Sequence, residues 1–133
     1  MRLIIGGYAQ GKLDYVLRQE GMEDWNVLDG ENVGHSWDDD ANTNARRNVV
    51  LNHFHSWVKE RMRQGGCPEK EIWAFLQKYP GCIIISDEIG NGIVPIDAFE
   101  REYRERTGRI LVELAARADE VVRVICGIGQ KIK

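Results

Sequence analysis

Short apolar runs alternate along this chain with longer segments in which apolar residues recur every three or four positions. The short runs are typical of strands buried in a parallel sheet and cover Met1–Ile5, Trp25–Asp29, Asn48–Leu51, Cys82–Ile85 and Val121–Ile125. The periodic segments predict helices over Leu13–Arg18, His53–Arg63, Glu69–Tyr79 and Ile96–Ala118. Strands that alternate with helices predict an α/β fold, a mostly parallel sheet with helices on both faces.

Three segments depart from this regular pattern. Gly30–Asn44 is polar and lacks periodicity, which predicts a long loop of the kind that is functional or mobile in a compact domain. Thr107–Gly108 predicts a kink or a break in the longest helix, and Gly127–Lys133 allows a short edge strand at the end of the chain.

The predicted topology also indicates where a ligand should bind, because ligands of such sheets lie beyond the carboxyl ends of the strands. We therefore expect four segments to gather at one edge of the sheet. They are the loop after Ile5, the residues after Leu51, the loop Ser86–Pro95 and the residues after Ile125.

The first strand runs directly into a glycine-rich segment, Gly6-Gly7-Tyr8-Ala9-Gln10-Gly11-Lys12-Leu13. Gly-x-x-x-x-Gly-Lys between a strand and a helix is the context of a phosphate-binding P-loop, with a glycine-rich turn as the alternative. Backbone N–H groups of such a loop face the phosphates, and Lys12 adds a positive charge. The motif ordinarily continues with Ser or Thr, whose hydroxyl ligates Mg²⁺, and Leu13 cannot do so. The segment thus predicts nucleotide binding and leaves the use of Mg²⁺ open.

Two acidic residues, Asp87 and Glu88, follow the most apolar strand. P-loop enzymes hold Mg²⁺ or activate the attacking group at this position, so either carboxylate could be catalytic; a turn cap and a solvated side chain are the alternative. Three arginines of the longest helix, Arg101, Arg104 and Arg109, are either a phosphate clamp or a charged face paired with neighbouring glutamates.

The histidines give weaker indications of a metal. His53 and His55 stand two residues apart at the start of a predicted helix, so their side chains should diverge, which does not favour a shared ion. His35 lies in the polar loop near Asp38–Asp40, where clustered carboxylates could hold a divalent cation; a solvated acidic turn is the simpler interpretation.

Composition narrows the class of protein. A chain of 133 residues, 43% hydrophobic and 29% charged, fits one domain spanning residues 1–133. The net charge of −3 argues against a nucleic-acid partner, and no apolar run is long enough to cross a membrane. The sequence opens with a strand instead of a signal peptide, so we expect a cytoplasmic location. Cys67, Cys82 and Cys126 are widely spaced and odd in number, which favours reduced thiols.

A more specific pattern begins at the two acidic residues. Asp87-Glu88-Ile89-Gly90-Asn91-Gly92-Ile93-Val94-Pro95 resembles the Asn-Glu-Val-Gly-x-Gly-Ile-Val-Pro loop of the bifunctional adenosylcobinamide kinase/adenosylcobinamide-phosphate guanylyltransferase family of cobalamin biosynthesis. Further residues follow at that family's spacing: Arg101, Arg104, Gly108-Arg109, Leu114-Ala115, Ala118-Asp119, Val121, Gly127-Ile128 and Lys133. Gly6–Lys12 matches the family's N-terminal Gly-Gly-x-x-x-Gly-Lys, and Val49–Leu51 with Trp57-Val58 resembles its second acidic strand.

The resemblance implies a RecA-like P-loop domain that phosphorylates the aminopropanol hydroxyl of a corrinoid, adenosylcobinamide, with ATP or GTP. It implies a second step in which GMP is attached through a guanylylated histidine, and a homo-oligomer, a symmetric trimer. By this resemblance Lys12 would neutralise charge that develops on the phosphates, and Glu88, with Asp87, would activate the metal or the hydroxyl.

The sequence departs from the family pattern at several functional positions. The serine of the P-loop is Leu13, and the aspartate that ends the second acidic strand is Asn52, which leaves Glu88 and Asn52 as the candidates for a metal. The His-Arg-x-x-Arg-Pro segment of the guanylylated histidine has no counterpart; His35 falls in that region without flanking arginines. The Asn-Gln pair of the family is Leu111-Val112. These departures favour a kinase over a guanylyltransferase, and they leave two alternatives: a catalytically degenerate nucleotide- or corrinoid-binding protein on the same fold, and an unrelated P-loop phosphotransferase.

Overall fold

The computed structural model describes residues 1–19, 21–32, 48–90 and 92–133. The elements of these residues are, in chain order, β1 (Arg2–Gly6), α1 (Lys12–Leu17), β2 (Asn26–Asp29), β3 (Val49–Asn52), α2 (Phe54–Arg63), α3 (Pro68–Lys78), β4 (Ile83–Asp87), α4 (Ala98–Arg117), β5 (Glu120–Ile125) and β6 (Ile128–Lys131). The strands form one sheet in the order β2-β3-β4-β1-β5-β6. All neighbours are parallel except β6, which runs antiparallel to β5. The predicted α/β fold with a mostly parallel sheet is confirmed.

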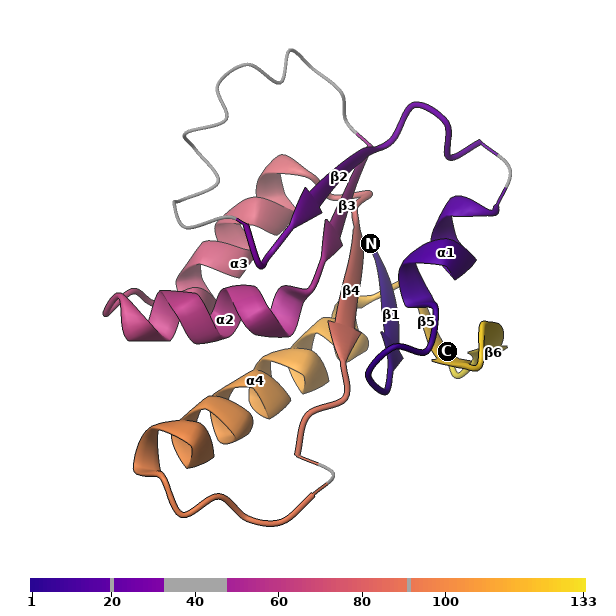
Figure 1. Ribbon diagram of the computed structural model, residues 1–133. Coiled ribbons are helices and arrows are strands. Elements are labelled where there is room, and N and C mark those ends of the chain that lie inside the picture. The colour runs from indigo at the N-terminus through magenta and orange to yellow at the C-terminus, as the bar shows by residue number, and fades with distance from the viewer. Residues whose placement is uncertain (20, 33–47, 91) are drawn as a thin grey trace.

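Helices cover both faces of the sheet, as predicted. Helices α2, α3 and α4 lie on one face and α1 lies on the other (Figure 1). Side chains of the strands alternate between the two layers, so that Leu3 and Ile84 pack toward α2–α4 while Ile4 and Ile85 pack toward α1. Both layers exclude water, which explains why β4 is apolar at consecutive positions.

Helix α4 is continuous over 20 residues. Thr107–Gly108 therefore does not interrupt it, and the predicted break is wrong. The side chain of Asp97 starts the helix by accepting hydrogen bonds from the backbone N–H groups of Phe99 (2.8 Å) and Glu100 (3.1 Å). Tyr103, Ile110 and Leu114 anchor it to the sheet as buried residues. This packing outweighs the roughly 1 kcal/mol by which glycine disfavours a helix interior.

The closing edge strand is present as β6, joined to β5 by the two-residue turn Cys126-Gly127. Both turn residues have positive φ, 50° and 76°, which is the backbone of a type I′ hairpin. None of the helices in the described part of the chain combines the length and the apolar composition that a membrane span requires.

Candidate functional site

A pocket of about 320 Å³ opens at the carboxyl edge of the sheet. Its described lining residues are Tyr8–Asp14, Asn52, His53, His55, Ile85 and Asp87. They come from the glycine-rich loop, the end of β3, the start of α2 and the end of β4. Three of the four segments that the topology predicted to gather at this edge therefore border one pocket.

The fourth segment, the hairpin turn after β5, supports the glycine-rich loop through Gln10. The backbone N–H of Cys126 donates to Gln10 Oε1 (2.8 Å), and that of Gly127 donates to the backbone oxygen of Gln10 (2.8 Å). At the start of the loop, a Cβ on Gly6 would overlap the carbonyl oxygen of Val124 in β5. The loop is thus fixed at its start and its middle by the strand and the turn behind it.

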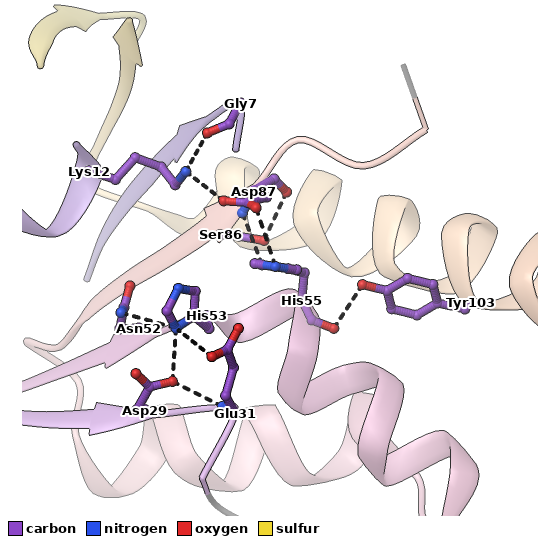
Figure 2. A network of polar contacts seen from close by, with 10 residues as sticks. All are labelled: Gly7, Lys12, Asp29, Glu31, Asn52, His53, His55, Ser86, Asp87 and Tyr103. Carbon is purple, nitrogen blue, oxygen red and sulfur yellow. Dashed lines mark hydrogen bonds and ion pairs between the residues drawn. The ribbon is translucent and has the colours of Figure 1, made fainter. Parts of the chain in front are cut away.

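Lys12 projects from the loop to the end of β4, where its ammonium group has two partners. Nζ donates to the backbone oxygen of Gly7 (2.6 Å) and pairs with Asp87 Oδ1 (2.5 Å) (Figure 2). The Lys12 and Asp87 side chains are only 8% and 14% exposed. An ammonium group carries three donor hydrogens, so an anion entering the pocket could take the third or displace the carboxylate.

His55 holds Asp87 from the opposite side. Its Nδ1 accepts a hydrogen bond from the backbone N–H of Asp87 (3.1 Å), which requires that nitrogen to be unprotonated, and Nε2 faces Asp87 Oδ2 at 3.4 Å (Figure 2). Burial lowers the pKa of His55; the Asp87 carboxylate opposes this, and nearby Lys12 adds to it. A neutral His55 that carries its proton on Nε2 satisfies both contacts.

A second polar cluster lies beside this pair, at the ends of β2 and β3. His53 Nδ1 is 2.8 Å from Asp29 Oδ1, 3.2 Å from Asn52 Nδ2 and 4.0 Å from Glu31 Oε2 (Figure 2). Burial alone would raise the pKa of Asp29, but hydrogen bonds from the Glu31 backbone and the His53 ring outweigh it and lower the pKa below its usual value.

His53 and His55 thus lie closer than their sequence spacing predicts. Both border the pocket, with ring centroids 6.0 Å apart. The reason is that His53 precedes the helix with φ 52°, in the left-handed region, so its side chain does not follow the helical spacing.

Over residues 17–132 the chain matches the sequence family described as cobinamide kinase / cobinamide phosphate guanyltransferase. The chain belongs to this family. The match confirms the resemblance found in the sequence, and it begins after the glycine-rich loop.

Two curated relatives carry the name bifunctional adenosylcobalamin biosynthesis protein CobU. That of Escherichia coli (strain K12) is 38% identical over 79 residues, which cover 58% of this chain and 44% of the relative. That of Salmonella typhimurium (strain LT2) is 47% identical over 51 residues, which cover 38% of this chain and 28% of the relative. The aligned part of this chain therefore spans less than half the length of either relative.

The two positions at which the family resemblance places Mg²⁺ ligands do not fit a hard cation here. Leu13 borders the pocket with a side chain that offers no ligand atom. Asn52 is buried, and its amide contacts the ring of His53. Neither position supplies the negatively charged oxygen that Mg²⁺ prefers.

Glu88, predicted with Asp87 as a catalytic or metal-binding residue, is not among the described residues that line the pocket. Its carboxylate forms a two-point ion pair with Arg123 of β5 (2.7 and 3.0 Å), and its backbone N–H donates to the oxygen of Gly6 (2.8 Å). The structure thus brings Lys12, Asp87 and Asn52 together at the pocket and directs the Glu88 carboxylate to β5, beyond β1.

The arginines of α4 do not border the pocket either, within the described residues. Arg101 donates to the carbonyl oxygens of Pro95 (3.0 Å) and Ile96 (2.6 Å), and Arg104 donates to that of Ile93 (2.7 Å). They fix the loop before α4, whereas Arg109 pairs with Glu105 (2.6 Å), as the charged-face alternative predicts. His35 and Asp38–Asp40 lie outside the described residues.

Proposed function

We propose that this chain binds a nucleoside triphosphate at Gly6–Leu13 and transfers its terminal phosphoryl group to a hydroxyl of a corrinoid, adenosylcobinamide. The observation that carries the proposal is the position of Lys12, whose ammonium group is held at the pocket between the Gly7 carbonyl and Asp87. Membership of the cobinamide kinase / cobinamide phosphate guanyltransferase family supports the substrate class.

In this mechanism the backbone of the loop and Lys12 bind the β- and γ-phosphates. The acceptor hydroxyl oxygen attacks the γ-phosphorus, the bond to the bridging oxygen breaks, and the nucleoside diphosphate leaves. Asp87 accepts the hydroxyl proton, because its carboxylate borders the pocket and His55 orients it through the contacts described above. Lys12 neutralises the charge that develops on the phosphates.

We propose phosphorylation without guanylyl transfer, since the family segment of the guanylylated histidine has no counterpart in this sequence. A second candidate function is nucleotide or corrinoid binding without turnover. It is favoured by Leu13 and Asn52, which replace two Mg²⁺-organising residues at the same pocket.

Titration calorimetry with ATP and GTP, each with Mg²⁺ and with chelator, tests the binding step, and assays of adenosylcobinamide phosphorylation test the transfer. We expect Lys12→Ala to weaken nucleotide binding by about 10- to 100-fold, the value of a charge-assisted hydrogen bond of roughly 1.5–3 kcal/mol. Lys70→Ala is the matched control, because Lys70 is exposed on α3 away from the pocket. Absence of nucleotide binding at millimolar concentration would overturn the proposal.

The double variant Leu13→Ser/Asn52→Asp separates the two candidate functions. Recovery of phosphorylation from an inactive parent would support a degenerate binding protein. If the parent chain is already active and the double variant phosphorylates no faster, the result would support an enzyme that uses other residues in place of the usual Mg²⁺ ligands.

A further inference from the structure

The second polar cluster has the donor atoms of a metal site. Asp29, Glu31 and His53 each contribute one ligand atom, and these three atoms lie within 4.8 Å of one another. We propose that this cluster binds a divalent cation of intermediate hardness, Mn²⁺ or Zn²⁺, beside the phosphate-binding loop. The binding does not depend on the proposed kinase function, although its use with a nucleotide would.

The cluster offers both nitrogen and oxygen as ligand atoms, and this combination determines the class of cation. One imidazole nitrogen and two carboxylate oxygens suit Mn²⁺ or Zn²⁺, whereas Mg²⁺ and Ca²⁺ favour sets made of oxygen alone. The two carboxylates also supply the negative charge that a cation requires. Asp29, His53 and Glu31 are 32%, 35% and 59% exposed, so an ion can enter and water can complete its coordination.

His53 Nδ1 lies close to a carboxylate oxygen of Asp29 and to the side-chain amide of Asn52. Asn52 Nδ2, at 3.2 Å, can only donate to this nitrogen, while Asp29 Oδ1, at 2.8 Å, can only accept from it. In any one tautomer of the ring, only one of these two contacts is therefore a hydrogen bond of Nδ1. A cation on Nδ1 would take the place of the proton, bridge Nδ1 to Asp29, and leave the Asn52 amide free to donate to the second oxygen of Asp29.

The backbone holds the ligands in place before an ion binds. Gly30 stands between Asp29 and Glu31, is buried, and donates its N–H to the carbonyl oxygen of Asn52 (2.8 Å). A Cβ at Gly30 would overlap the carbonyl oxygen of His53, so the two segments approach as closely as only glycine permits. This contact fixes the β2 end, with its two carboxylates, against the β3 end that carries His53.

The cluster lies next to the phosphate-binding loop, at the wall of the same pocket. His53 and Asn52 border the same pocket as the glycine-rich loop. In that loop, the position where the motif ordinarily has a metal-binding hydroxyl is Leu13, which offers no ligand atom. A cation on Asp29, Glu31 and His53 would lie at the pocket wall formed by β3, on the side away from the Lys12–Asp87 pair (Figure 2).

Titration of chelator-treated, full-length chain with Mn²⁺, followed by electron paramagnetic resonance and without nucleotide, tests the proposal. We expect one saturable site that Zn²⁺ displaces and that Mg²⁺ and Ca²⁺ displace at least about tenfold less readily. Pulsed measurements should detect nitrogen coupled to the bound Mn²⁺.

Glu31→Gln and His53→Asn should each weaken Mn²⁺ binding by about tenfold or more, and His53→Asn should abolish the nitrogen coupling. Asparagine is chosen because it tolerates the left-handed backbone of position 53. Glu113→Gln is the matched control, since Glu113 is an exposed carboxylate on α4. If His53→Asn fails to fold, Glu31→Gln and the nitrogen coupling of the parent chain still decide the question, because the Glu31 side chain is largely exposed.

Failure of this proposal can be told apart from failure of the kinase proposal. Lys12→Ala should keep the Mn²⁺ site, and Glu31→Gln should keep nucleotide binding in the presence of chelator. Absence of a saturable Mn²⁺ or Zn²⁺ site, or affinities unchanged in both cluster variants, would overturn the assignment whatever the nucleotide results.

Discussion

Replacement of Asp87 by asparagine should destabilise the protein and yet strengthen its binding of a nucleotide. The substitution keeps the size of the side chain and removes its charge. Lys12 is only 8% exposed. Of its two contacts described above, it would lose the ion pair with Asp87 and keep the hydrogen bond to the Gly7 carbonyl. The ammonium charge would be largely uncompensated in a site with little access to water.

The size of the stability loss follows from that burial. Removal of one partner of a fully buried ion pair costs about 3–5 kcal/mol. Asp87 is 14% exposed and Lys12 retains its bond to Gly7, so we expect a smaller loss in Asp87→Asn, about 2–3 kcal/mol. The double variant Lys12→Met/Asp87→Asn should lose less than the sum of the two single variants, because no buried charge then remains.

Nucleotide binding should change in the opposite direction. In the parent chain an incoming phosphate competes with the Asp87 carboxylate for Lys12 and is repelled by its charge. Asp87→Asn removes both effects, and we expect binding in chelator to become about tenfold tighter, or about 1.4 kcal/mol. Phosphorylation of adenosylcobinamide should fall by about 100-fold or more, since the proposed proton acceptor is lost.

Urea denaturation and calorimetry measure the two effects on the same samples. Weaker nucleotide binding by Asp87→Asn would refute the idea that the carboxylate competes with phosphate for Lys12. A stability within about 0.5 kcal/mol of the parent would refute the buried-charge argument, because surface substitutions produce changes of that size.

Three further predictions concern the supports of the site and the surface. Gln10→Ala should lower the free energy of unfolding by about 1 kcal/mol and weaken nucleotide binding, because the Cys126 backbone N–H loses its acceptor; denaturation and calorimetry would check both, and unchanged binding would contradict the supporting role of the turn. Gly30→Ala should cost about 1–3 kcal/mol through overlap with the His53 carbonyl, and a neutral result in urea denaturation would show that the segments can separate. The two-point bond with Arg106 lowers the pKa of Glu69 to about 2. Since this folded-state pKa lies below the ordinary value, the stabilisation is complete above about pH 4.5 and is lost as the pH falls through about 2. Melting curves of the parent and Glu69→Gln should therefore converge over that interval, and a constant difference would argue against the pairing.

The sequence was sufficient to predict the fold because the buried strands have a nearly continuous apolar pattern. β4 is apolar at consecutive positions since both of its faces are covered, and this pattern distinguishes a parallel sheet from one with an open face. The glycine-rich loop was equally predictable, because its residues are contiguous and its neighbours are a strand and a helix. Both features were predictable because each depends on residues that are adjacent in the sequence.

The partners of Asp87 and Glu88 were not predictable, because they depend on contacts between distant segments. Glu88 follows Asp87 directly, yet the Asp87 carboxylate pairs with Lys12, whereas the Glu88 carboxylate pairs with Arg123 of β5. The left-handed backbone of His53 had no indication in the sequence either. Gly30 lies against the carbonyl oxygen of His53, and periodicity cannot reveal this contact between distant segments.

The junction between β3 and α2 connects the two polar clusters of the pocket. His53 contacts Asp29, and His55, two residues later, contacts Asp87, so one short segment touches the proposed cation site and the lysine–carboxylate pair. The hydroxyl of Tyr103 in α4 donates to the carbonyl oxygen of His55 (3.0 Å) and fixes this segment against the helix. The pocket therefore contains charged groups although positions 13 and 52 carry uncharged side chains. The charged groups in and beside the pocket are Lys12 of the loop and the carboxylates at the ends of β2 and β4, which the junction contacts through His53 and His55.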